Sequence, residues 1–187
     1  NILPLLSNID SENFETYLYA EVPNPDGMTD RFRNVCDYWR DIFAHPDETV
    51  AQTIRNDGID LLVFLAGHFD QNRLPVCVFR PAPVQISFHD GATSGFDEMD
   101  YWLTDSALHP ENSTEQFSED LYRLPVFYQY TPILNAPPAS PRLIEKNGMI
   151  TFGSFNNPGK INNEVIALWT NILNETADSR LMLKYRG

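Results

Sequence analysis

Short apolar runs alternate with amphipathic stretches along the chain, which is typical of strands and helices that follow one another in a parallel α/β sheet. Residues 59–66 form a nearly continuous apolar run, which predicts a strand buried on both faces of the sheet. Before it, residues 48–56 have the apolar spacing of a helix, which Asp47 caps and Gly58 ends. The remaining elements predicted in this part are strands at residues 15–20, 84–88 and 101–104 and a short helical segment at residues 72–80.

A proline-rich segment interrupts this rhythm at residues 128–147, and we interpret it as a linker between two lobes. Beyond the linker, residues 149–154 predict a buried strand, a helix begins near Asn162, and a last strand covers residues 180–185. One face of the predicted helix is apolar and consists of Val165, Ile166, Leu168, Trp169, Ile172 and Leu173.

We therefore expect an α/β protein in which residues 1–127 form most of an N-terminal lobe. Residues 148–187 would then form the first βαβ unit of a second lobe, truncated before its sheet is complete. The chain opens at Asn1, already within an apolar segment, so we expect it to be a fragment of a longer protein.

Composition and charge limit the possible functions. With 187 residues and 42% hydrophobic residues, the chain can bury a core. The formal net charge of −13 argues against a general nucleic-acid binder, because binding to phosphate backbones depends on clustered Lys and Arg. The sequence shows no signal peptide and no apolar run long enough for a membrane span. Cys36 and Cys77 lack metal or redox spacing, so we expect reduced core cysteines and a cytoplasmic protein.

The turn at residues 152–160 is the first candidate site. A strand that feeds a helix through a glycine-containing turn directs the free N–H groups of the helix toward the end of the sheet, where phosphates bind. Lys160 adds a positive charge there, and Asn157 can donate a hydrogen bond to the same anion. The competing interpretation is an ordinary connection with an exposed lysine. The turn is neither a Walker loop nor a G-x-G-x-x-G fingerprint.

Two predicted strand ends supply further candidates. His68 follows the strand at residues 59–66, where it can act as a general acid or base, or simply bond to nearby backbone. Thr93 and Ser94 follow the strand at residues 84–88 and can bond a sugar or a phosphate. His109 lies beside a proline in a predicted loop, and we expect it to face solvent.

Arg73 is expected to pair with Asp70 or Asp60. The His, Cys and Asp residues show no metal-ligand spacing, and no D-x-D motif holds a metal–diphosphate. If the ligand is a nucleotide-sugar, the negative charge of its leaving group would then have to be stabilised by cations and helix N-termini instead of a metal.

These segments, in this order, resemble the catalytic region of glycosyltransferase family 41, the protein O-GlcNAc transferases and the related Spindly proteins. The resemblance covers nearly the whole chain. Its most specific parts are Arg-Pro-Ala-Pro-Val-Gln at residues 80–85 and Gly-Ser-Phe-Asn-Asn-Pro-Gly-Lys at residues 153–160, supported by residues 54–63, 65–68, 99–105 and 122–125.

The resemblance implies a GT-B architecture with two Rossmann-like lobes around a cleft. It implies metal-independent, inverting transfer of N-acetylglucosamine (GlcNAc) from UDP-GlcNAc to Ser or Thr hydroxyls of proteins, with no cofactor beyond the nucleotide-sugar. By the same resemblance Lys160 contacts the donor diphosphate, Asn157 assists it, and His68 lines the cleft as a proton-transfer group. Tetratricopeptide repeats are expected upstream of Asn1, and the short join between the lobes resembles bacterial members.

One departure leaves alternatives open. The family usually reads G-Y-P-G-T-[ST]-G where this chain has His89-Asp-Gly-Ala-Thr-Ser-Gly95, which suggests a changed acceptor or sugar pocket. The same fold can use another donor, GDP-fucose or UDP-glucose, with O- or N-linked transfer. A third alternative is a non-catalytic binding module in which the site has decayed.

Overall fold

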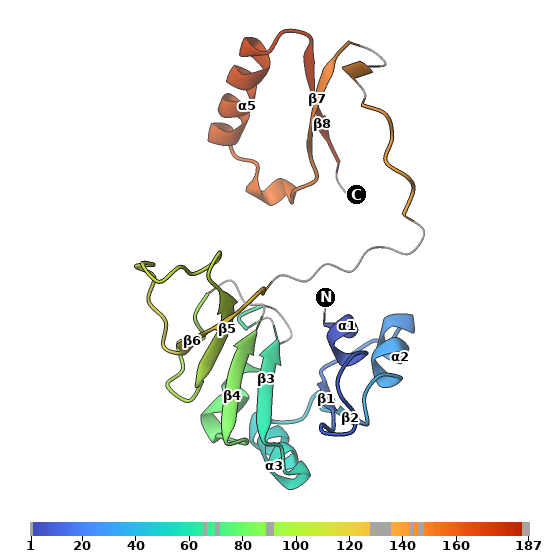
Figure 1. The fold of residues 1–187 in the computed structure, drawn as a ribbon. Helices are drawn as coiled ribbons and strands as arrows, with labels where there is room; N and C mark the ends of the chain where they lie inside the picture. The colour runs from blue at the N-terminus through green and yellow to red at the C-terminus, as the bar shows by residue number, and fades with distance from the viewer. Residues whose placement is uncertain are drawn as a thin grey trace. The chain divides into compact units, whose positions relative to one another are not determined.

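The computed structural model describes residues 2–65, 67–69, 72–88, 92–127, 136–142, 144–145 and 148–184. The chain divides into two compact units, residues 1–131 and 132–187 (Figure 1). Every strand pairing in the described ranges is parallel, which confirms the predicted α/β class. None of the described helices has the length and apolar character needed to cross a membrane.

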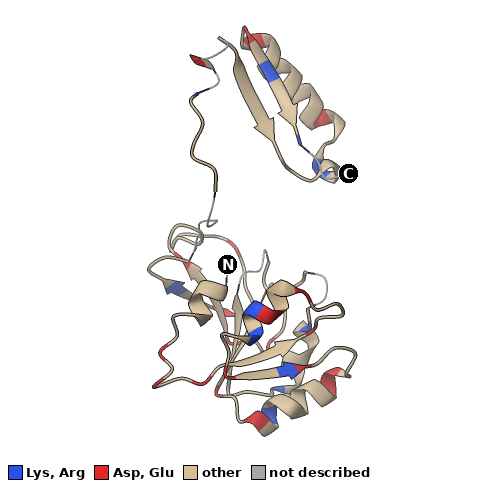
Figure 2. Cartoon of the chain, turned by 90° about the vertical axis from the view of Figure 1, so that its right-hand side faces the viewer, with Lys and Arg blue, Asp and Glu red and all other residues tan. Residues whose placement is uncertain are grey.

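The two units differ sharply in charge. Residues 1–131 contain seven Lys and Arg against 22 Asp and Glu, a formal net charge of −15. Residues 132–187 contain six Lys and Arg against four Asp and Glu, a net charge of +2, and all three lysines of the chain belong to this unit. Figure 2 shows the acidic residues spread over the helices and loops of the first unit. The acidity of the chain is therefore a property of its first unit alone.

The first unit contains two parallel sheets, a pair with the order β1-β2 and a four-stranded sheet with the order β3-β4-β5-β6. The pattern of the sequence did not predict α1, α2, β2 or β6. The elements in chain order are α1 (Leu3–Leu6), β1 (Tyr17–Ala20), α2 (Gly27–Arg33), β2 (Tyr38–Asp41), α3 (Asp47–Asp57), β3 (Leu61–Leu65), the 3₁₀ helix η1 (Leu74–Phe79), β4 (Val84–Phe88), β5 (Tyr101–Asp105) and β6 (Asp120–Leu124).

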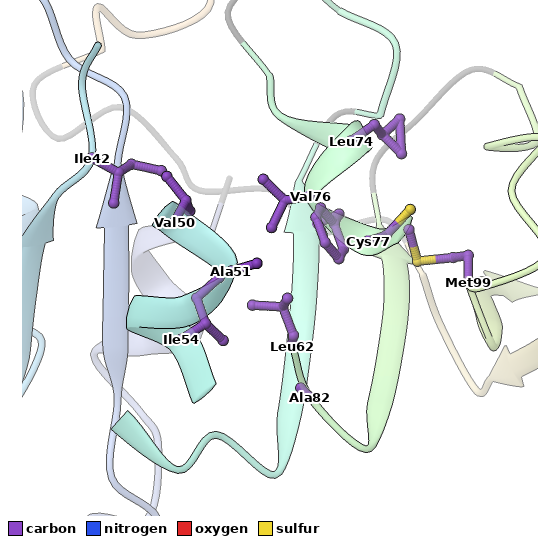
Figure 3. Packing of buried hydrophobic residues seen from close by; sticks show 11 residues of the cluster. Ile42, Val50, Ala51, Ile54, Leu62, Leu74, Val76, Cys77, Ala82 and Met99 are labelled. Carbon is purple, nitrogen blue, oxygen red and sulfur yellow. The ribbon is translucent and has the colours of Figure 1, made fainter. Parts of the chain in front are cut away.

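The core of the first unit lies between α3, η1 and one face of β3 (Figure 3). Helix α3 contributes Val50, Ala51 and Ile54, each at most 2% exposed. The helix begins at Asp47 itself, and its N-cap is Pro46, so the predicted capping role of Asp47 is wrong. Gly58 ends α3 in the left-handed conformation with φ 69°, which confirms the predicted glycine stop.

Strand β3 is buried on one face only, which corrects the prediction of burial on both. Leu62 and Phe64 are 9% and 7% exposed and join the core with α3 and η1. The alternate residues Leu61, Val63 and Leu65 are 51%, 38% and 39% exposed. The apolar sequence of β3 is compatible with burial on one face or on both, because it contains no polar residue that would mark the uncovered face.

The second unit is a single βαβ arrangement. Strands β7 (Ile150–Ser154) and β8 (Ser179–Leu183) pair in parallel, and η2 (Pro158–Lys160) and α5 (Asn163–Glu175) connect them. Strand β8 begins and ends earlier than predicted, and Tyr185 lies outside the described residues. The predicted apolar face of α5 is covered only in part: Val165, Trp169 and Leu173 are half-buried, whereas Ile166, Leu168 and Ile172 are 40–59% exposed.

Candidate functional site

The turn between β7 and α5 has the predicted strand–turn–helix form. The backbone N–H of Gly159 donates to Asn157 Oδ1 at 2.9 Å, and the backbone N–H of Lys160 donates to the Asn157 carbonyl oxygen at 3.0 Å. Asn162 then caps α5, because its Oδ1 accepts from the N–H of Val165 at 2.9 Å. The chain thus reaches the helix through two successive asparagine caps, with Lys160 between them.

Lys160 is exposed, and no described acidic side chain forms an ion pair with it. Its charge therefore remains for an anion from solution. The start of α5 is less favourable than predicted: Asn162 already satisfies the N–H of Val165, and Glu164 places a negative charge in the first turn. Of the two groups predicted to bind an anion, the ammonium group of Lys160 is thus more favourable than the N-terminus of α5.

An apolar hollow in the second unit is distinct from this turn. It lies between the two strands and α5 and is lined mainly by Phe152, Trp169, Ile172, Leu173 and Leu181. Charged side chains are absent from its lining, so it offers an anion nothing to bind.

In the first unit the structure joins two of the predicted strand-end candidates. The side chain of His68 is exposed, and its Nε2 lies 3.0 Å from the carbonyl oxygen of Thr93. A carbonyl oxygen only accepts hydrogen bonds, so Nε2 is the donor and carries a hydrogen. In the neutral ring the lone pair is then on Nδ1. The contact therefore fixes the tautomer of the neutral His68 ring.

Thr93 and Ser94 are engaged by a carboxylate that the sequence did not indicate. Thr93 Oγ1 donates to Glu119 Oε2 at 2.6 Å, and the N–H of Ser94 donates to Glu119 Oε1 at 2.8 Å. The backbone N–H of Ser118 donates to Thr93 Oγ1 at 3.0 Å, and the Ser118 Oγ accepts from the N–H of Gly95 at 3.1 Å.

Ser94 is 3% exposed. The Ser94 Oγ accepts from the N–H of Phe96 at 3.3 Å. For the Thr93 hydroxyl to bind a nucleotide-sugar, its bond to Glu119 would have to open, and for the Ser94 hydroxyl its burial would have to be relieved.

Glu119 is 5% exposed and is held as a carboxylate. Burial alone would raise its pKa, but the hydrogen bonds from Ser94 and Thr93 outweigh that effect, so the pKa lies below its ordinary value. Glu119 is 25 and 26 residues from Ser94 and Thr93 in the chain, and no spacing rule connects such positions. The sequence therefore contains no signal that could have identified Glu119.

The prediction about His109 is wrong. His109 was expected to face solvent, but its side chain is 16% exposed, with Nε2 3.1 Å from Glu115 Oε2 and Nδ1 bonded to the hydroxyl of buried Thr104.

Arg73 has two partners that were not predicted: its Nε lies 3.0 Å from Glu21 Oε2 and 3.6 Å from Asp47 Oδ1. Of the two predicted partners, Asp60 forms no ion pair with it in the described ranges, and Asp70 lies outside them.

Two further predicted features are only partly visible. Residues 89–91 of the segment that departs from the family pattern, and Asp70, lie outside the described residues.

Within the described ranges, no group of three His, Cys, Asp or Glu side chains could hold a metal ion. Both cysteines are free thiols, Cys77 buried and Cys36 half-buried, so only Cys77 is the core residue that was expected.

Comparison with known proteins gives consistent matches. A family model described as glycosyl transferase family 41 matches residues 4–130. The probable UDP-N-acetylglucosamine–peptide N-acetylglucosaminyltransferase SPINDLY of Eustoma exaltatum subsp. russellianum is 40% identical over 187 residues, which cover 97% of this chain and 20% of the relative. The enzyme of that description named SEC in Arabidopsis thaliana is 27% identical over 183 residues, 92% of this chain and 19% of the relative.

Among solved structures, a lysine-to-methionine variant of the Thermobaculum terrenum O-GlcNAc transferase matches with a TM-score of 0.85 and 36% identity. The match covers 97% of this chain and 35% of that chain, and it confirms the predicted GT-B fold class. The chain spans about a fifth of the length of the curated relatives it matches.

Proposed function

This chain belongs to glycosyl transferase family 41, and we propose that the protein of which it is part transfers GlcNAc from UDP-GlcNAc to Ser or Thr hydroxyls of acceptor proteins. The reaction proceeds with inversion and without a metal ion. Tetratricopeptide repeats upstream of Asn1 and a cytoplasmic location belong to the same proposal, and both rest on the family resemblance alone.

The observation that carries the proposal is the position of Lys160. It is exposed, it follows a parallel strand through a hydrogen-bonded turn, and no described carboxylate neutralises it. It also belongs to the unit with a net positive charge, whereas an anion near residues 1–131 would meet a net charge of −15. An ammonium group in this setting suits the diphosphate of a nucleotide-sugar.

The proposed chemistry is the displacement of UDP by an acceptor hydroxyl. As the glycosidic bond breaks, negative charge grows on the diphosphate, and Lys160 stabilises that charge more strongly in the transition state than in the bound donor. Asn157 supplies a further hydrogen bond to the same group. His68 is the proposed proton-transfer group for the hydroxyl. Thr93 and Ser94 are the weaker proposed ligands of the nucleotide-sugar, since the Thr93 hydroxyl is bonded to Glu119 and Ser94 is 3% exposed.

The test is Lys160→Ala in the full-length protein, measured as initial rates of GlcNAc transfer to an acceptor protein. We expect kcat to fall by about 10²- to 10³-fold, as for other preorganised groups that stabilise a leaving charge. Lys184→Ala is the matched control, because it removes the same charge from an exposed lysine of the same unit whose ammonium lies over the Phe155 ring. Undiminished turnover in Lys160→Ala would refute the proposed role.

The donor itself requires a separate experiment. GDP-fucose and UDP-glucose are the competing donors, and steady-state hydrolysis and transfer by the full-length protein with each nucleotide-sugar distinguish them. Calorimetry with the same panel distinguishes an enzyme from a binding module with a decayed site. Binding of no nucleotide-sugar would favour the decayed module.

A further inference from the structure

A single peptide unit connects Glu119 to His68. The peptide between Thr93 and Ser94 presents its N–H to Glu119 Oε1 at 2.8 Å and its C=O to His68 Nε2 at 3.0 Å. In a trans peptide these two groups point in opposite directions. The carboxylate and the imidazole therefore hold opposite edges of one peptide plane.

The remaining contacts of Glu119 fix that plane in place. Its second oxygen, Oε2, accepts from Thr93 Oγ1 at 2.6 Å and from Ser118 Oγ at 3.1 Å. Thr93 is thus held through its side chain, and Ser94 through its N–H. Since the carbonyl of Thr93 shares the plane with that N–H, its direction is set by Glu119 as well.

We propose that Glu119 is a positioning residue that acts through the Thr93–Ser94 peptide to keep His68 in the tautomer with hydrogen on Nε2. The relay consists of carboxylate, peptide N–H, peptide C=O and imidazole N–H. Its catalytic meaning rests on the proposed function, in which His68 transfers the proton of the acceptor hydroxyl. In that tautomer Nε2 remains anchored to the protein, and the lone pair of the neutral ring lies on Nδ1.

The proposed relay differs from a purely structural role, in which Glu119 only holds the loop by hydrogen bonds, because the relay depends on the charge of Glu119. A buried carboxylate polarises the peptide that donates to it, and this makes the carbonyl at the other end a stronger acceptor, by about 10–30% per bond in condensed-phase estimates. A purely structural role needs only the hydrogen bonds, and an uncharged amide could supply most of them. The relay also needs the negative charge of Glu119.

Nitrogen-15 NMR of the histidine rings tests the proposal directly. The chain has four histidines, so ¹⁵N-histidine labelling gives four ring systems, and His68→Gln identifies the one that belongs to His68. In the wild-type chain the neutral ring of His68 should carry its hydrogen on Nε2. In Glu119→Gln we expect a smaller fraction of this tautomer and severalfold faster solvent exchange of the Nε2 hydrogen.

The matched control is Glu115→Gln, the same change four residues away in the same loop. Glu115 contacts His109 and does not touch the Thr93–Ser94 peptide, so His68 should keep its wild-type tautomer and exchange rate. Thermal unfolding of each variant establishes that the fold is retained. An unchanged His68 in a folded Glu119→Gln chain, or an equal change in Glu115→Gln, would overturn the proposal.

The wild-type spectrum keeps the proposal testable even if Glu119→Gln does not fold, since hydrogen mainly on Nδ1 of the neutral ring would refute it. In the full-length protein, Glu119→Gln should lower kcat. These outcomes are independent of the Lys160 experiment: loss of the donor assignment leaves the tautomer result standing, and an unaltered tautomer leaves the donor assignment standing.

Discussion

The backbone N–H of Lys160 donates to the carbonyl oxygen of Asn157 at 3.0 Å, so the two residues predicted to bind the donor diphosphate belong to one hydrogen-bonded turn. The side chain of Asn157 supports the same turn, because its Oδ1 accepts from the N–H of Gly159. An asparagine serves here in two ways: its oxygen shapes the turn, and its amide nitrogen can donate to an anion. Structure and binding are therefore separable by substitution.

Asn157→Asp should keep the turn and weaken donor binding. The carboxylate still accepts from the N–H of Gly159, but it places a negative charge beside the proposed diphosphate and removes the amide donor. We expect the donor KM of the full-length protein to rise by about tenfold or more, equivalent to the loss of roughly 1.4 kcal/mol. Asn157→Ala, which loses the turn contact without adding charge, should affect donor KM less. The opposite ranking would show that turn geometry dominates.

Gly58→Ala should destabilise the first unit by about 1 kcal/mol, because a residue with a Cβ is strained in the left-handed region. Gly58 has φ 69°, and an added Cβ would meet no atom within 4 Å, so the cost comes from the backbone alone. Gly27→Ala is the control, since Gly27 opens α2 with equally open space and without a positive φ. Urea denaturation of the chain should show a lower midpoint for Gly58→Ala and an equal or higher midpoint for Gly27→Ala.

The sequence predicted best where local chemistry decides the structure. The turn from β7 to α5 was predicted correctly because Gly159, Asn162 and the apolar spacing of the helix are all local signals. Helix α2 was missed although Asp26 and Thr29 form a capping box, since the helix has only seven residues and little apolar periodicity.

Long-range relationships could not be predicted in the same way. The burial of one face of β3 depends on which side α3 and η1 pack, and the apolar run carries no information about that choice. Glu119 reaches Thr93 across 26 residues, and its carboxylate resembles any other in an acidic sequence. The residues of the candidate site were thus identifiable by position in the chain, whereas the group that holds two of them was not.

Thr104→Val should destabilise the chain by about 1–2 kcal/mol. The hydroxyl of Thr104 is fully buried and bonds His109 Nδ1, and valine has the same shape without the polar group, so the imidazole nitrogen loses its partner. Thr53→Val removes a hydroxyl that bonds only the carbonyl of Thr49 on an exposed part of α3, and its effect should lie within about 0.5 kcal/mol. Equal unfolding free energies for the two variants would contradict the structural role of His109.

The stability of the chain should depend on Asp57 in a defined pH range. The hydrogen bond from Arg40 lowers the pKa of Asp57, with Arg40 Nη2 2.7 Å from Oδ1 and the hydroxyl of Tyr19 donating to Oδ2 at 2.8 Å. A carboxyl whose pKa is lower in the folded state stabilises the fold above its unfolded pKa, about 3.9, and loses this effect as the pH falls through the folded pKa.

The difference in unfolding midpoint between wild type and Asp57→Asn should therefore be constant above about pH 5 and shrink steadily below about pH 4. Tyr19→Phe removes one neutral donor from the same carboxylate and should cost about 1 kcal/mol at neutral pH. Urea denaturation at a series of pH values measures both variants. If the midpoint difference between wild type and Asp57→Asn instead grew as the pH fell, folding would raise the pKa of Asp57. The contacts of Asp57 with Arg40 and Tyr19 predict the opposite.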